Sequence, residues 1–332
     1  MLEAIVMLFR DPNMQWIFLG CSLLGLSSGL IGCFTYLRKQ SLVGDTLAHA
    51  ALPGICIAFM LSGVKSMFLF LIGATVAGFI ATIGIGVITR HSKLKQDAAL
   101  GIVLSTFFGF GIVLLSIIQR GDYGNQAGLN RFMFGQAASM VSSDVYMMAI
   151  ISVLLVIICF LLFKQFKLIS FDPGFARGLG YPVTFLEQLM LLLVVIAVVA
   201  GIQAVGVVLV AALLITPAVA ARYWTNQLSI MVILSSVIGA ASGGLGTLIS
   251  ASVPNMPTGP VTVLAAAFIF LISILFGSSK GLLFRKLQYR KVKQSFELEF
   301  AGEVAIHANE ATTTPHALSR KKRQQAGKGS QT

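Results

Sequence analysis

The stretch LVGDTLAHAALPGICIAFML, residues 42–61, places a carboxylate and an imidazole inside an otherwise apolar segment. Asp45 and His49 are four residues apart, so on a helix both side chains lie on one face, about one turn from each other. A carboxylate near the middle of a bilayer costs about 2.5–3.5 kcal/mol on insertion scales, so such a group usually faces a cavity, a partner or a transported ion. This segment therefore predicts both a membrane helix and the place of function.

The rest of the chain has the composition of a multi-pass membrane protein. Of its 332 residues 56% are hydrophobic and only 11% are charged. We expect an all-α, polytopic transmembrane helical bundle of about eight or nine spans, although the sixth and seventh segments nearly touch and counts of eight or ten stay open. The apolar segments long enough to cross a bilayer are residues 16–37, 42–61, 66–89, 98–118, 145–163, 185–200, 204–223, 228–249 and 261–276.

The positive charges gather on one side of this series when successive segments alternate in direction. The other side would carry only Arg10, Lys65, Arg120 and Arg131. The positive-inside rule makes the first side cytoplasmic, with the N-terminus outside and the C-terminus inside. The residues on the basic side are Arg38, Lys39, Arg90, Lys93, Lys95, Lys164, Lys167, Arg177, Arg222 and the cluster at 285–293.

The net charge of +12 does not indicate nucleic acid, because residues 285–332 alone carry ten Lys or Arg against four Glu. We expect an N-terminal segment at 1–15, a transmembrane domain at 16–280 and a basic, disordered cytoplasmic tail at 281–332. Residues 130–141 are too short to span and predict a re-entrant or interfacial piece on the outer side.

The Asp45/His49 pair allows two interpretations, a structural one and a metal-binding one. The pair can simply neutralise itself or cap a kinked helix near Pro53. Alternatively it binds metal, since a carboxylate oxygen with an imidazole nitrogen suits Mn²⁺, Zn²⁺ or Fe²⁺. We favour metal binding. Two ligands are too few for a tight site, but they suit a transport site, because a transported ion must also leave. A symmetric dimer would supply two carboxylates and two imidazoles. Cys56 lies seven residues further on, but the four cysteines lack metal-type spacing and predict apolar packing.

Four segments carry a resemblance to a known family. Residues 41–54 (SLVGDTLAHAALPG) resemble the signature of the permease subunits of bacterial manganese, zinc and iron ABC importers, the ABC-3 family. Residues 171–180 (FDPGFARGLG), 213–222 (LLITPAVAAR) and 257–260 (PTGP) are similar to further family segments in the same order. Gly174 stands where the family usually has an acidic residue. The resemblance covers roughly residues 15–280.

The resemblance implies a permease that pairs with a second permease chain, identical or related. It also implies a cytoplasmic ATP-binding subunit and an extracytoplasmic metal-binding lipoprotein as partners. The sequence agrees on one point, because it contains no GxxxxGK[ST] phosphate loop. We therefore expect a transporter subunit rather than an enzyme, with no permanently bound cofactor and a transported Mn²⁺, Zn²⁺ or Fe²⁺ ion.

The longest expected cytoplasmic loop, residues 164–187, is dense in Pro and Gly. It can be an ordinary solvated connector. We favour a short interfacial helix within 175–179, capped near Asp172, that docks on the ATPase, and the coupling residues we single out are Asp172, Pro173, Ala176 and Gly180.

These observations favour the permease of an ATP-driven divalent-metal importer in a bacterial plasma membrane, with manganese ahead of zinc and ferrous iron. The alternatives are a permease for vitamin B12 or iron-siderophore, which has little need of a buried Asp/His pair, and a metal antiporter driven by an ion gradient.

Overall fold

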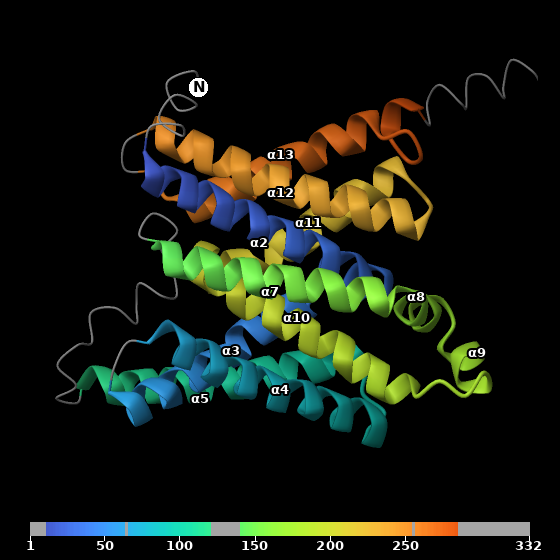
Figure 1. The fold of residues 1–332 in the computed structure, drawn as a ribbon. Helices are drawn as coiled ribbons and strands as arrows, with labels where there is room; N and C mark the ends of the chain where they lie inside the picture. The colour runs from blue at the N-terminus through green and yellow to red at the C-terminus, as the bar shows by residue number, and fades with distance from the viewer. Residues whose placement is uncertain (1–10, 64–65, 121–139, 254–255, 285–332) are drawn as a thin grey trace, which may run out of the picture.

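The computed structural model describes residues 11–63, 66–120, 140–253 and 256–284, which form α-helices and no strand (Figure 1). Most of the expected re-entrant piece at 130–141 and nearly all of the tail at 281–332 lie outside these residues. The helices are α2 (Pro12–Leu37), α3 (Val43–Ser62), α4 (Met67–His91), α5 (Gln96–Arg120), α7 (Ser142–Leu161), α8 (Phe163–Phe171), α9 (Pro173–Gly178), α10 (Val183–Val205), α11 (Val207–Trp224), α12 (Leu228–Ser252) and α13 (Thr258–Phe276).

The predicted membrane segments each correspond to one helix of the structure. Eight helices in the described part of the chain are long and apolar enough to cross a membrane, and α11 adds a shorter apolar stretch, Val210–Trp224. Only Gly206 separates α10 from α11. Its φ of 92° lies in a region that glycine adopts without strain, so the chain ends one helix and begins the next within a single residue.

The first helix begins earlier than the apolar pattern predicts. α2 starts at Pro12 rather than near residue 16, because Asp11 caps it: the Asn13 N–H donates to the Asp11 carboxylate at 2.9 Å. Proline is favoured at the first helical position, where its missing N–H is not needed.

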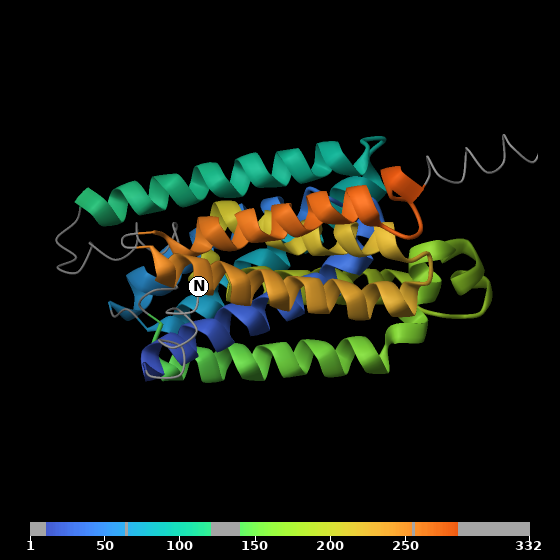
Figure 2. The same cartoon turned by 90° about the horizontal axis from the view of Figure 1, so that it is seen from above.

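Figures 1 and 2 show the long helices running lengthwise, with α8 and α9 at one end of the bundle. Figure 2 shows α5 and α7 at opposite outer edges of the bundle, whereas α3 packs against α4, α5, α10 and α11. Burial follows this arrangement: 72% of the membrane-length part of α3 is buried within the chain, against 22% of that of α5. The helix that carries Asp45 and His49 is therefore central, and α5 leaves most of its surface for lipid or a partner.

Glycines set the closest helix contacts. A Cβ added at Gly25 of α2 would collide with the carbonyl oxygen of Gly239 in α12, and the reverse substitution would collide likewise. Gly54 of α3 and Gly73 of α4 meet in the same manner. Small residues allow backbones to approach in a membrane, where van der Waals packing replaces the hydrophobic driving force. These contacts hold α2 against α12 and α3 against α4.

The expected loop at 164–187 contains one helix more than predicted. α8 occupies residues 163–171, because Phe166 and Ile169 recur at helical spacing and both side chains are buried in the main core. The Phe166 ring packs against Phe34 of α2 with ring centroids 5.6 Å apart. The segment after the fifth predicted span is thus an ordered extension of the bundle.

Candidate metal site and coupling helix

His49 lies near mid-depth of the bundle although it is in the second turn of its own helix. Its ring packs edge-on against Phe108, with centroids 4.7 Å apart and planes at 74°. Phe108 is the central residue of α5, about 18 Å from the start of that helix at 1.5 Å per residue. α3 therefore begins well inside the bundle, which places the Asp45/His49 pair near mid-depth.

The two side chains face each other along one side of α3. Asp45 Oδ1 lies 3.5 Å from His49 Nε2, too far for a strong hydrogen bond. The Asp45 side chain is 40% exposed and that of His49 is 20% exposed in the single chain. His49 Nδ1 is buried and has no hydrogen-bond partner among the described residues. The pair is thus open on one side, as expected of groups that bind something outside this chain.

Among the described residues of a single chain, Asp45 and His49 are the two candidate metal ligands of this site. The described residues contain no group of three or more His, Cys, Asp and Glu side chains that could hold a metal ion. Divalent first-row metals usually take four to six ligands, so the pair needs water, backbone oxygens or a second chain to complete a coordination shell.

Pro53 weakens α3 one turn beyond His49. Proline has no N–H, so Pro53 cannot donate to the carbonyl of His49, four residues earlier. A helix without that bond bends more easily at this point. The sequence GDTLAHAALPG therefore places a weak point of the helix one turn after the two candidate ligands.

Two of the segments that resemble family motifs pack together. A Cβ added at Gly44 of α3 would lie 2.9 Å from Leu214 Cδ2 and 3.6 Å from the Ala211 Cα, both in α11. The first turn of α3 is therefore seated against α11. Cys56 is buried, and its thiol donates to the Gly111 carbonyl of α5 at 3.9 Å, which is a packing contact. All four cysteines are buried and unpaired.

The second candidate element is the short helix α9. Asp172 caps its N-terminus, since the Phe175 N–H donates to Asp172 Oδ1 at 2.8 Å, and Pro173 is the first helical residue. At the other end the Tyr181 N–H donates to the Ala176 carbonyl and the Gly180 N–H to the Arg177 carbonyl. This is a Schellman motif, and Gly180 has the positive φ of 82° that it requires.

Of the four predicted coupling residues, Asp172, Pro173 and Gly180 are exposed and Ala176 is buried. Asp172, Pro173 and Gly180 define the ends of α9, and Ala176 is fully buried on the side where α9 packs against α8 and α10. The outward face carries Phe175 and Leu179, with exposed fractions of 58% and 56%. Neither side chain is among the coupling residues predicted from the sequence, although their spacing of four residues is a detectable signal of an apolar helix face.

Together the fold and the mid-depth pair define a multi-pass membrane transport protein rather than an enzyme. Residues 10–277 match the family described as ABC 3 transport family, and the chain belongs to this family.

Similar proteins support this assignment over nearly the whole chain. The chain is 48% identical to the manganese transport system membrane protein MntC of Bacillus subtilis, over 89% of this chain and 68% of that protein. It is 43% identical to the zinc transport system membrane protein TroC of Treponema pallidum, over 88% of this chain and 98% of that protein. The solved structure of PsaBC from Streptococcus pneumoniae in complex with Fab superimposes with a TM-score of 0.75 at 33% identity, covering 87% of this chain and 99% of that one.

Proposed function

We propose that this chain is the membrane permease of an ATP-driven divalent-metal importer and that the ion passes Asp45 and His49. The observation that carries the proposal is the position of this pair at mid-depth on a buried helix, with its ligand atoms open on one side. Ionisable groups at that depth are costly and are kept where an ion or a partner compensates them.

Manganese is the proposed cargo, followed by zinc and ferrous iron. The carboxylate is a hard ligand, the imidazole a borderline one, and neither the site nor its surroundings offers a free thiolate, which zinc would favour. MntC of Bacillus subtilis, at 48% identity, is named as a manganese transport protein, and TroC of Treponema pallidum, at 43%, as a zinc transport protein. A hydrated ion would exchange part of its water shell for Asp45 Oδ1 and His49 Nε2 and leave when the two chains move apart.

Three partners complete the proposed transporter: a cytoplasmic ATP-binding subunit, an extracytoplasmic metal-binding lipoprotein and a second permease chain. The bundle end that carries α8 and α9 also carries the basic residues that follow α2 and α4, so the positive-inside rule makes it the cytoplasmic end. In this orientation Phe175 and Leu179 of α9 face the ATP-binding subunit. An exposed apolar pair on a rigid, doubly capped helix suits docking into a groove of that subunit.

Reconstitution tests the proposed function directly. We expect proteoliposomes that contain the permease and its ATP-binding subunit to accumulate radioactive Mn²⁺ only when ATP is available to that subunit. The control omits the ATP-binding subunit and imposes a proton or sodium gradient. Uptake driven by the gradient alone would identify an antiporter, and uptake of cobalamin or a ferric siderophore without free metal would identify the other alternative.

Pairing of two permease chains predicts a specific crosslink. Leu42 is 49% exposed and lies one turn before Asp45 on the same face, so a cysteine there should crosslink to a second chain without removing a ligand. The background has the four buried native cysteines replaced. The matched control is Phe160→Cys on α7, which is 82% exposed on the bundle exterior. We expect the Leu42→Cys crosslink to vary with the nucleotide state, and a fully active monomer in nanodiscs would contradict the pairing.

A further inference from the structure

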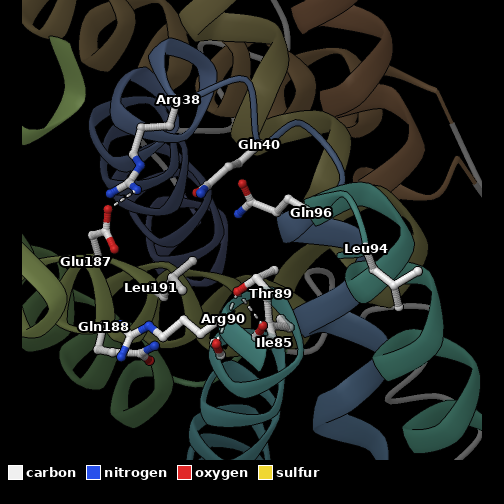
Figure 3. Close-up of a pocket in the computed structure, with 11 residues that line it drawn as sticks. Arg38, Gln40, Ile85, Thr89, Arg90, Leu94, Gln96, Glu187, Gln188 and Leu191 are labelled. Carbon is white, nitrogen blue, oxygen red and sulfur yellow. Dashed lines mark hydrogen bonds and ion pairs between the residues drawn. The ribbon is translucent and has the colours of Figure 1, made fainter. Parts of the chain in front are cut away.

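A polar cavity of about 320 Å³ opens among the helix ends on the α9 side of the bundle (Figure 3). Its walls come from the end of α2, the last turn of α4, the start of α5 and the first turns of α10. At about 30 Å³ for each liquid water, the space admits roughly ten molecules. Its lining includes the ion pair between Arg38 and Glu187, whose Nη2 and Oε1 atoms are 2.6 Å apart.

The ion pair joins the two elements that transport must couple. Glu187 is in the second turn of α10, nine residues after the end of α9, the proposed coupling helix. Arg38 is the C-cap of α2 and stands five positions before Val43, the first residue of α3, which carries Asp45 and His49. Figure 3 shows the Arg38 guanidinium and the Glu187 carboxylate next to each other in the lining of the cavity. The contact thus links the first turns of α10 directly to the turn that leads into α3.

The turn between Arg38 and α3 is held in a defined shape. Its backbone forms a Schellman motif, since the Gln40 N–H donates to the Thr35 carbonyl and the Lys39 N–H to the Tyr36 carbonyl. Lys39 has a φ of 57°, a left-handed conformation that is uncommon for a residue other than glycine. Strain of this kind persists where the surrounding structure imposes it, and such sites often belong to moving parts.

Buried polar atoms around the pair have no hydrogen-bond partner within the described residues. They are Arg38 Nη1, Gln40 Oε1 and Gln188 Oε1, and the Gln40 side chain, whose residue is only 4% exposed, points into the cavity (Figure 3). Buried polar atoms in proteins normally have a hydrogen-bond partner. The two glutamine oxygens are acceptors, so they offer alternative partners to the Arg38 guanidinium when its bond to Glu187 breaks, and the cavity has room for water to solvate both charges.

We propose that Arg38 and Glu187 are positioning residues of transport: their ion pair transmits the movement of α9 and α10 to the turn before α3 and so sets the position of the Asp45/His49 pair. The proposal rests on the proposed function. Neither residue binds the ion, and their contribution is to couple ATP hydrolysis to the movement of metal.

The test measures metal transported for each ATP hydrolysed in proteoliposomes that contain the permease with its ATP-binding subunit. We expect Glu187→Gln and Arg38→Gln to lower this ratio about tenfold, within the range of coupling between contacting residues, while ATP hydrolysis stays within about twofold. The charge-swapped double variant, Arg38→Glu with Glu187→Arg, should recover the ratio to within about threefold of the unmodified protein, because it restores an ion pair at the same place. Arg90→Gln is the matched control, since Arg90 lines the same cavity and forms no ion pair with the described residues.

The outcomes separate this proposal from the function it rests on. An unchanged ratio in both single variants, in proteoliposomes where the unmodified permease transports metal, overturns the positioning role alone. A reduced ratio that the charge swap does not recover, with normal assembly shown by size-exclusion chromatography, also overturns it. Absence of ATP-driven metal uptake by the unmodified complex overturns the proposed function itself.

Discussion

Asp45→Ala and His49→Ala are each expected to reduce metal uptake by about 100-fold or more, while expression and membrane insertion stay normal. Loss of groups that merely support a metal site typically costs 10–100-fold, and these residues are the proposed ligands themselves. Removing either group also relieves an insertion cost, so the helix should tolerate the change. The measurement is uptake of radioactive Mn²⁺ and Zn²⁺ in cells with matched permease levels.

Two matched variants separate the loss of a ligand from a general effect of lost charge. Asp97→Asn removes a carboxylate from the first turn of α5, and His91→Ala removes an exposed imidazole from the last turn of α4. Both should retain near-normal uptake. Asp45→Asn and His49→Gln keep side-chain volume beside Phe108 and should still fail. Near-normal uptake in the Asp45 and His49 variants would show that the ion does not use this pair.

The second large effect is expected from one glycine at the end of α9, the proposed coupling helix. Gly180→Val should abolish most metal-stimulated ATP hydrolysis and weaken co-purification with the ATP-binding subunit, with the Asp45/His49 pair unchanged. A β-branched residue at a φ of 82° is strained by roughly 1–3 kcal/mol, enough to unmake the C-terminal cap and misplace Phe175 and Leu179. Hydrolysis and pull-down yields are measured at equal permease concentration.

Gly178→Val is an internal control for this experiment. Open space surrounds both Gly178 and Gly180, since an added Cβ would meet no atom within 4 Å at either, and only Gly180 has a positive φ. The two variants thus differ in backbone strain and not in steric room. Equal ATP hydrolysis and equal pull-down yields for the two variants would contradict a role for the capped shape of α9. The segment would then be an ordinary solvated connector.

Several features followed from the sequence because their causes are local. Apolar segments of about 20 residues need only length and composition to predict a spanning helix, and each predicted segment corresponds to a helix. The spacing of Asp45 and His49 set their common face, and Asp172 caps the short helix as expected, although α9 spans Pro173–Gly178 rather than 175–179 because Pro173 takes the first helical position. The early start of α2 and the presence of α8 were missed, because a polar cap and a short amphipathic helix give weak hydropathy signals.

The sequence alone determined the class of protein, the number of apolar segments to within one, and the two residues with metal-ligand chemistry, because hydropathy and helical periodicity depend on neighbouring residues. Only the tertiary structure decided the depth of His49, which depends on its contact with the middle of α5. It also decided that Ala176 is buried while Phe175 is exposed, and that Arg38 meets Glu187 across 149 residues of chain. Contacts between distant segments depend on how helices pack, and no local pattern encodes that packing.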